Sequence, residues 1–233
     1  MKHRSIFHKS ILVLENQLSP QFCSHTINKF EEPQSEKKAG FTASGQALGV
    51  KQSTDLMISF GEGSENWKAE DRVFSESLSS ALIKYRQHMD KVLPGIHIDG
   101  ELFDVGHQMQ RTCPGGYYHW HNDSSDSRQL TYIWYLNDVN GGGGYTEFCD
   151  GTKVYPKAGR MLIFPANFVY VHRGVTPKKD LKYIVTGWVY QRLSGCSLVL
   201  DNSGIDLREH NQHANENNND DIQLDCNGTT EIP

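Results

Sequence analysis

The sequence contains little that would place it among secreted, membrane-spanning or nucleic-acid-binding proteins. Its five cysteines are odd in number, widely spaced and without a CxxC motif: they are Cys23, Cys113, Cys149, Cys196 and Cys226. In a chain of this length, such usage predicts reduced thiols and a cytoplasmic location rather than a disulfide framework. The beginning of the chain has basic residues but an apolar run of only four residues, 11–14, so neither a signal peptide nor a membrane span is expected.

An excess of positive charge is also missing. The 23 lysines and arginines are outnumbered by 28 aspartates and glutamates, which gives a formal net charge of -5. This balance argues against a general electrostatic attraction to nucleic acid or to anionic membranes, so neither is expected as a partner. With 37% hydrophobic residues in 233 positions, the chain can fill one sizeable core, and we expect one soluble globular unit.

Two helices are predicted in the first hundred residues, after a short strand at 11–14. Ser19 can cap the first helix, and Pro20 suits its first turn. A second helix is expected over about 67–89, where apolar residues recur at helical spacing. Between the helices, residues 34–64 form a long, polar, glycine-rich segment. Loops of this length are either active-site lids or disordered, and the sequence leaves both open.

After Gly95 the sequence changes to short β-rich runs separated by clusters of glycine, proline, asparagine and aspartate. Many short strands at this spacing are typical of a β-sandwich or barrel, so the expected fold class is mainly β with flanking helices (α+β). Three parts are expected: an N-terminal strand and helices that pack on the core (1–100), the β core (101–200), and an asparagine-rich acidic tail that should be mobile (201–233).

The segment His121-Asn122-Asp123 carries the first sign of chemistry. In a strand, residues two apart point to the same face, so this imidazole and this carboxylate can bind one ion. A histidine from another strand would complete a set of two histidines and one carboxylate, which leaves three coordination positions open and suits iron(II). With eleven histidines in the chain, an HxD motif also arises by chance, and surface histidines are the simpler interpretation of this motif alone.

Two residues further along the chain strengthen the metal interpretation. His172 lies in a β-like context, FVYVH, and Lys182 follows ten residues later in an otherwise apolar stretch, LKYI. A buried ammonium is costly without an anionic partner, and the distal carboxylate of a dicarboxylic co-substrate would supply one. On an alternating strand the lysine can instead point to solvent, and the residue alone does not decide between the two.

Six blocks between Thr112 and Val189 resemble the prolyl 4-hydroxylase-like branch of the 2-oxoglutarate/iron(II) dioxygenases. They are PGGYYHWHND, RQLTYIWYLND, GGGGYTEF, YPKAGRMLIFPA, YVHRGVTP and KYIVTGW, in the order of that family. The opening VLENQLSPQFCSHTINKFEE resembles the family's N-terminal strand and helix. The resemblance implies a double-stranded β-helix, or jelly roll, whose mouth holds Fe(II). It also implies 2-oxoglutarate and dioxygen as co-substrates, and L-ascorbate to restore oxidised iron.

The resemblance assigns roles at the centre of such a site. It makes His121, Asp123 and His172 the catalytic metal ligands. Lys182 would bind the distal carboxylate of 2-oxoglutarate, and Tyr135 would donate a second hydrogen bond to it.

Further roles implied by the resemblance lie around this centre. Tyr118 and Trp188 match positions that line the cofactor site, although ordinary core packing also explains aromatic residues there. Arg128 falls where some relatives contact the substrate. Thr112 stands where most prolyl 4-hydroxylases carry a tyrosine, so its contact with the co-substrate would have a shorter reach. Thr131 shares a strand face with the tyrosine of the YLN block and should point into the same pocket.

The implied reaction is the hydroxylation of an unactivated C–H bond, with a prolyl residue in a protein or peptide as the expected substrate. The carboxylate of Asp123 favours hydroxylation, because halogenating relatives lack it. The same chemistry on a free amino acid or small metabolite is one alternative, and a metal-binding jelly-roll module without turnover is another. Nucleic-acid demethylation fits less well, because the chain is acidic and has a lysine where repair-type relatives carry arginine.

Overall fold

The computed structural model describes residues 6–33, 36–42, 45–46, 49–60, 64–95, 101–124 and 127–192. The helices are α1 (Ile6–Lys9), α2 (Pro20–Glu31), the 3-10 helix η1 (Ser64–Trp67) and α3 (Lys68–Val92). The strands are β1 (Leu12–Leu14), β2 (Lys38–Ala39), β3 (Phe41–Thr42), β4 (Gly45–Gln46), β5 (Thr54–Met57), β6 (Glu101–Asp104), β7 (Gln108–Thr112), β8 (Tyr118–His121), β9 (Arg128–Tyr135), β10 (Thr146–Phe148), β11 (Lys153–Val154), β12 (Met161–Pro165), β13 (His172–Gly174) and β14 (Lys182–Arg192). The predicted mainly-β architecture with flanking helices is confirmed.

The strands form two antiparallel sheets whose inner faces meet. The larger sheet has the order β1-β12-β9-β14-β7-β5-β2, with β6 also paired to β14, and it therefore includes strands from both sides of residue 100. The smaller sheet has the order β11-β10-β13-β8, and β3 pairs separately with β4. Side chains of both sheets pack together between them. Phe148 and Val154 come from the smaller sheet, and Ile133, Leu162 and Ile184 from the larger.

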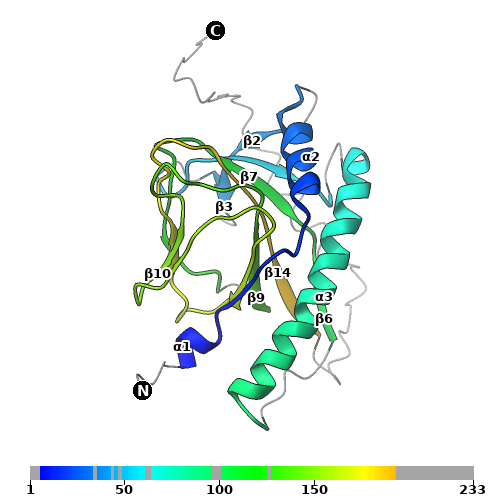
Figure 1. Ribbon diagram of the computed structural model, residues 1–233, viewed down its shortest axis with the longest axis vertical. Helices are drawn as coiled ribbons and strands as arrows, with labels where there is room; N and C mark the ends of the chain where they lie inside the picture. Colours follow the sequence, from blue (N-terminus) through cyan, green and yellow to red (C-terminus); the bar gives the residue numbers. More distant parts are fainter. Residues whose placement is uncertain are drawn as a thin grey trace.

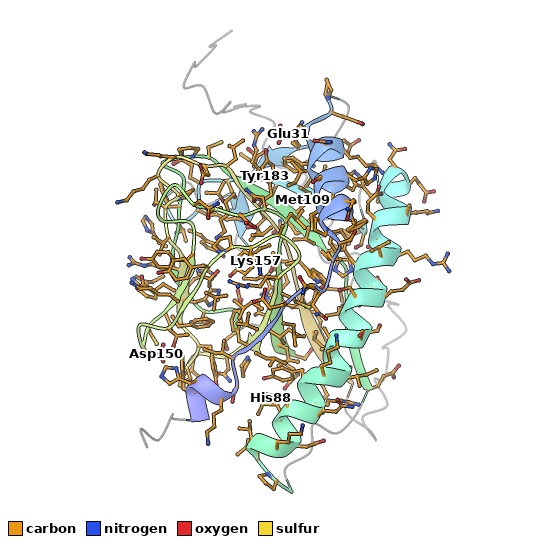
Figure 2. All side chains as sticks on the ribbon, viewed as in Figure 1. Glu31, His88, Met109, Asp150, Lys157 and Tyr183 are labelled. Atoms are coloured by element: carbon orange, nitrogen blue, oxygen red, sulfur yellow. The ribbon has the colours of Figure 1, made fainter. Side chains whose placement is uncertain are left out.

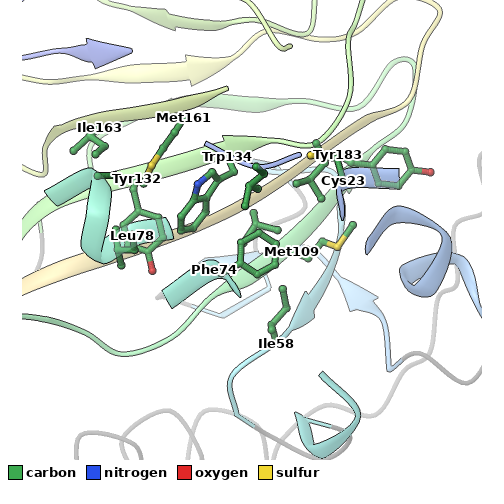
Figure 3. Packing of buried hydrophobic residues seen from close by; sticks show 14 of the residues in the cluster. Cys23, Ile58, Phe74, Leu78, Met109, Tyr132, Trp134, Met161, Ile163 and Tyr183 are labelled. Carbon is green, nitrogen blue, oxygen red and sulfur yellow. The ribbon is translucent and has the colours of Figure 1, made fainter. Parts of the chain in front are cut away.

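The two faces of the larger sheet have different environments. On β9, Tyr132 and Trp134 point to the helices, while Ile133 and Tyr135 point to the smaller sheet. This alternation follows from the two-residue period of a strand. Figure 1 shows α2 and α3 beside the sheets, and Figure 3 shows the core that they bury against the larger one. There the ring of Phe74 lies 5.2 Å from that of Trp134. Helices thus cover one face and leave the other for the site.

Helix α2 begins as the sequence predicts and is fixed to the sheet at its end. Ser19 Oγ accepts a hydrogen bond from the backbone N–H of Phe22 at 3.1 Å, which caps the helix. At the last turn, Tyr183 Oη donates to Glu31 Oε1 at 3.0 Å, and Arg111 Nη1 lies 2.9 Å from Glu31 Oε2. Figure 2 labels Glu31 and Tyr183 at this junction. The long second helix, α3, is also confirmed.

The segment expected to be a loop between the helices contains strands. β5 pairs with β7 and β2 pairs with β5, both antiparallel. Just before β5, Lys51 forms an isolated bridge with Tyr118 of β8, so the chain passes here from the smaller sheet to the larger. The expectation of a long loop is wrong for these residues. Strands of two to four residues are too short to show alternation, and β5 buries two consecutive side chains, Asp55 and Leu56.

The N-terminal helix α1 closes one end of the space between the sheets. Phe7 stacks on Tyr170, with ring centroids 4.5 Å apart and an interplanar angle of 9°, and meets Phe148 edge-on at 6.1 Å. His8 Nδ1 lies 3.0 Å from Asp150 Oδ2. Figure 1 shows α1 near β10, and Figure 2 labels Asp150 beside it.

The prediction of reduced thiols is wrong for one cysteine. Cys113 is disulfide-bonded, whereas Cys23 and Cys149 are free. Spacing along the chain carries no information about which cysteines meet in the fold, so sequence alone could not reveal this. Cys196, Cys226 and the predicted acidic tail at 201–233 lie outside the described residues. Among the described helices, none combines the length and apolar character needed to cross a bilayer.

Candidate metal and co-substrate site

The three predicted metal ligands come together between the sheets. His121 ends β8 and His172 begins β13, and the two residues are directly paired in the smaller sheet. Asp123 follows β8 by two residues. One ligand atom from each lies within 4.8 Å of the other two. The separations are 3.9 Å from His121 Nε2 to Asp123 Oδ1 and 3.6 Å from His172 Nε2 to Asp123 Oδ2.

Backbone and side-chain hydrogen bonds orient each ligand. His121 Nδ1 lies 2.8 Å from His119 O, and His172 Nδ1 lies 3.0 Å from Tyr170 O. Because a carbonyl oxygen only accepts, both Nδ1 atoms donate, and each Nε2 keeps a free lone pair for a metal. Thr131 Oγ1 of β9 donates to Asp123 Oδ2 at 2.7 Å, which confirms that this threonine faces the pocket.

The protonation states of His121 and Asp123 also favour the binding of a metal ion. Burial, followed by the neighbouring His172, lowers the pKa of His121 to about 4, so its imidazole is neutral at neutral pH. Burial alone would raise the pKa of Asp123, but His172, His121 and the Thr131 hydroxyl outweigh it and lower the pKa. A neutral imidazole and an ionised carboxylate are the forms that bind a divalent cation.

A β-bulge brings Tyr118 to the side of β8 on which His121 lies. Between the pairs His172↔His121 and Gly174↔Tyr118 the register shifts, so that two residues of β8 face the single residue Arg173. Regular alternation would place residues three apart on opposite faces, and the bulge cancels this. The Tyr118 ring therefore lies parallel to the His121 ring, with centroids 3.6 Å apart and an angle of 10°.

Lys182 of β14 is buried close to β8 and β13, the two strands that carry His121 and His172. The side chain is 5% exposed and has no hydrogen bond or ion pair with any described residue, and burial lowers its pKa to about 8. Its Nζ lies 5.9 Å from the centroid of the Tyr135 ring. A Cβ at Gly174 would lie 3.9 Å from Nζ and 3.5 Å from Tyr118 Cβ, so glycine leaves room between them. The ammonium thus lies beside Tyr135, Gly174 and Tyr118 without an ion pair among the described residues.

The two other residues predicted near the distal carboxylate flank this lysine. Thr112 of β7 is the direct antiparallel partner of Lys182. Tyr135 is fully buried, and its Oη lies 2.7 Å from Thr146 Oγ1 of β10. Burial raises the pKa of Tyr135 well above its usual range, so the phenol remains a donor. Sequence reasoning missed Thr146, since its partnership across the sheets leaves no local pattern.

Arg128 and Trp188 lie next to each other on the inner face of the larger sheet. The guanidinium lies 3.8 Å from the centroid of the Trp188 ring, and Arg128 Nε donates to Tyr190 Oη at 3.2 Å. A second register shift, between the pairs Val189↔Leu130 and Tyr190↔Arg128, turns Arg128 to this face. The Trp188 Nε1–H is buried and has no acceptor within the described part of the chain, which suits an acceptor on a bound ligand.

The chain matches one protein family in sequence. A model of the 2OG-Fe(II) oxygenase superfamily matches residues 107–190, a segment that contains the metal ligands and Lys182. This segment is therefore similar to the 2OG-Fe(II) oxygenase superfamily. The match implies Fe(II) and 2-oxoglutarate as cofactor and co-substrate. A comparison with curated protein sequences finds no match.

Several solved structures are similar to this chain in fold. A viral collagen prolyl hydroxylase from Paramecium Bursaria Chlorella virus-1 is 20% identical with a TM-score of 0.56, and the match covers 78% of this chain and 97% of that one. A Pseudomonas putida prolyl-4-hydroxylase is 18% identical with a TM-score of 0.55, over 78% and 93%. A Trichoplax adhaerens prolyl hydroxylase, in complex with a hypoxia inducible factor peptide fragment, is 18% identical with a TM-score of 0.60, over 78% and 84%. The predicted jelly-roll fold is confirmed.

The residues present fit the groups that this superfamily uses. Two imidazoles and one carboxylate within 4.8 Å are a donor set for iron(II), and the set leaves coordination positions open. The buried ammonium of Lys182 has no counter-ion among the described residues, and a dicarboxylate would supply one.

Proposed function

We propose that this oxygenase hydroxylates an unactivated C–H bond of a prolyl residue in a protein or peptide, using Fe(II), 2-oxoglutarate and dioxygen. The observation that carries the proposal is the buried ammonium of Lys182, which has no ion pair with any residue that the structure describes, beside three residues that can hold a metal ion. A module that only bound a metal would have no use for a costly buried cation.

Each residue has a defined task. His121, Asp123 and His172 hold the iron, which when bound with 2-oxoglutarate and dioxygen supplies the oxidising chemistry. Lys182 forms an ion pair with the distal carboxylate, and Tyr135 with Thr146 offers hydroxyl groups at the same end of the pocket. Thr112 borders the anchor from β7. The surrounding apolar residues exclude water from the reacting atoms.

A prolyl substrate is supported by the mouth of the site and by the neighbours. Trp188 offers an apolar ring and an unpaired N–H, which suit a pyrrolidine ring and a peptide carbonyl respectively. Arg128 lies on that ring, where its remaining N–H groups can bind substrate carbonyl oxygens. One structural neighbour is a prolyl hydroxylase with a bound peptide. A free amino acid or small metabolite is the competing substrate class.

An anaerobic titration of the apo-protein with Fe(II) and 2-oxoglutarate tests the chemistry. We expect a visible metal-to-ligand charge-transfer band that is absent in His172→Ala. Stoichiometric succinate release should follow when oxygen and substrate are added, and we propose that L-ascorbate sustains turnover. Mass spectrometry of proline-containing peptides against free amino acids then identifies the substrate class. Without the band, the binding-module alternative would replace this proposal.

A further inference from the structure

A buried ion pair lies beside the metal ligands and has no part in the proposed reaction. Lys51 Nζ and Asp55 Oδ2 are 2.6 Å apart, and their side chains are 3% and 0% exposed. Ser53 Oγ donates to Asp55 Oδ1 at 2.8 Å. Burying two charges costs several kcal/mol per ion, and apolar residues of similar volume are often as stable or more so. Stability alone therefore does not explain the pair.

The ion pair spans the corner at which the two sheets meet. Asp55 belongs to β5 of the larger sheet, where it pairs with Gln110 of β7. Lys51 bridges to Tyr118 of the smaller sheet. Backbone hydrogen bonds on either side fix this bridge, from Gln52 N to Tyr117 O at 2.7 Å and from His119 N to Val50 O at 2.9 Å. The ammonium is therefore held at a fixed place relative to β8.

One aromatic ring, that of Tyr118, lies between the Lys51 ammonium and the predicted metal ligands and contacts both. Lys51 Nζ lies 5.3 Å from the centroid of the Tyr118 ring, within the range of a cation–π interaction. The same ring stacks on the ligand His121 at 3.6 Å. A continuous series of contacts thus leads from a buried carboxylate to a predicted metal ligand. It runs through Asp55, Lys51, Tyr118 and His121.

We propose that Lys51 and Asp55 are positioning residues that hold Tyr118 against His121, so that the imidazole is oriented before the metal arrives. The proposal rests on the proposed metal site but not on turnover with 2-oxoglutarate. Fixing a side chain in advance removes the cost of ordering it from the binding step. Residues that orient a metal ligand typically change metal affinity by about 10–100-fold when removed.

Titration of the full-length apo-protein with Co(II) tests the proposal, since its d–d absorption reports the ligand geometry without turnover. For Lys51→Met and Asp55→Asn we expect the Kd for Co(II) to rise about tenfold and the d–d band to change. Lys51→Arg, which keeps the cation, should restore both. Unchanged affinity and an unchanged band in folded single variants would overturn the proposal.

The double variant Lys51→Met/Asp55→Leu distinguishes a role in orienting the metal ligand from a role in stabilising the junction of the two sheets. It does so even if the single variants fail to fold. It replaces the pair by apolar side chains, so thermal stability should be close to that of the wild type. We expect its Co(II) affinity to stay about tenfold lower. If the double variant keeps the wild-type Co(II) affinity and the wild-type d–d band, the ion pair only stabilises the junction of the two sheets, and the proposal is overturned.

A matched control breaks a buried ion pair far from the metal ligands. Glu70 of α3 is 4% exposed at its side chain and lies 2.7 Å from Lys29 Nζ of α2. Glu70→Gln should lower thermal stability and leave Co(II) binding unchanged. Weaker Co(II) binding in this control would show that any loss of stability weakens the site, and would overturn the proposal. A wild-type protein that binds Co(II) but gives no charge-transfer band with Fe(II) and 2-oxoglutarate would contradict the proposed function alone.

Discussion

The buried ammonium of Lys182 lowers the stability of the apo-protein and is expected to favour the binding of an anion. Burial lowers its pKa from 10.5 to about 8, which corresponds to a cost on the order of 3 kcal/mol for the charged form. The cost is complete below about pH 8 and fades as the pH rises from there toward 10.5, the ordinary value. The apo-protein therefore carries a penalty that an anionic ligand would relieve.

Replacing this ammonium should stabilise the apo-protein. For Lys182→Met we expect an increase in the free energy of unfolding of about 1–3 kcal/mol, because an apolar side chain of similar length needs no counter-ion. The variant should no longer gain stability from 2-oxoglutarate in the presence of Co(II). Thermal unfolding with and without 2-oxoglutarate measures both effects, and Lys182→Arg serves as the charged control. A destabilised variant would mean that the ammonium already has a favourable partner.

The affinity for 2-oxoglutarate should depend on pH through the same residue. Below about pH 8 the ammonium is charged and can bind the distal carboxylate, and above it the ion pair is lost as the proton leaves. We expect the Kd for 2-oxoglutarate to rise by up to about tenfold per pH unit above pH 8. Calorimetric titration of Co(II)-loaded protein checks this, and Lys182→Arg should show a flat profile over the same range. A flat wild-type profile would place the anchor elsewhere.

At the scale of single elements, the short helix α1 has a structural task. Phe7 stacks on Tyr170 and closes the end of the inter-sheet core. Phe7→Ala should lower the free energy of unfolding by about 2 kcal/mol, somewhat less than for a fully buried ring. Urea unfolding measures the loss, and Co(II) affinity should change less than twofold. Ile83→Ala, at a side chain 59% exposed, is the control that should change neither. An equal loss in both variants would contradict a specific role for α1.

The sequence predicts the elements that carry a long pattern and misses those built from short pairings. Helices α2 and α3 follow from capping and periodicity. The HxD motif yields two of the clustered residues, although β8 ends at His121 and Asp123 lies just beyond the strand. β5 is missed because its four residues bury Asp55 and Leu56 in succession, which no alternating pattern predicts. The Lys51–Asp55 pair is consequently missed as well.

Two pocket residues are predicted only through the family resemblance. By alternation, Tyr118 should face away from His121, because the two residues are three positions apart. The bulge that reverses this depends on pairing with β13, which lies some fifty residues further along the chain. No local feature of the sequence reveals it. Arg128 depends in the same way on a register shift against β14.

At the scale of the whole molecule, the metal site joins the two sheets. The ligands belong to the smaller sheet and the segment after β8, and Thr131 of the larger sheet holds Asp123. A metal that binds only the folded state stabilises it by RT ln(1 + [L]/Kd), about 2.7 kcal/mol at a hundredfold excess over Kd. We expect Co(II) to raise the unfolding temperature by about 5–10 °C for a domain of this size. Scanning calorimetry measures the shift, which should vanish in Asp123→Ala. A persistent shift in that variant would indicate a second metal site.

The two register shifts also determine what a one-residue insertion or deletion in β8 or β9 would change. Each shift adds one residue to a strand, at 119–120 in β8 and at Gln129 in β9. Loss of one residue at Gln129 would turn Arg128 away from Trp188, and loss of one at 119–120 would turn Tyr118 away from His121. The alternation that directs Thr131 would stay as it is. A single-codon deletion in β9 would therefore change the Arg128–Trp188 surface, whereas one in β8 would change the surroundings of a predicted metal ligand.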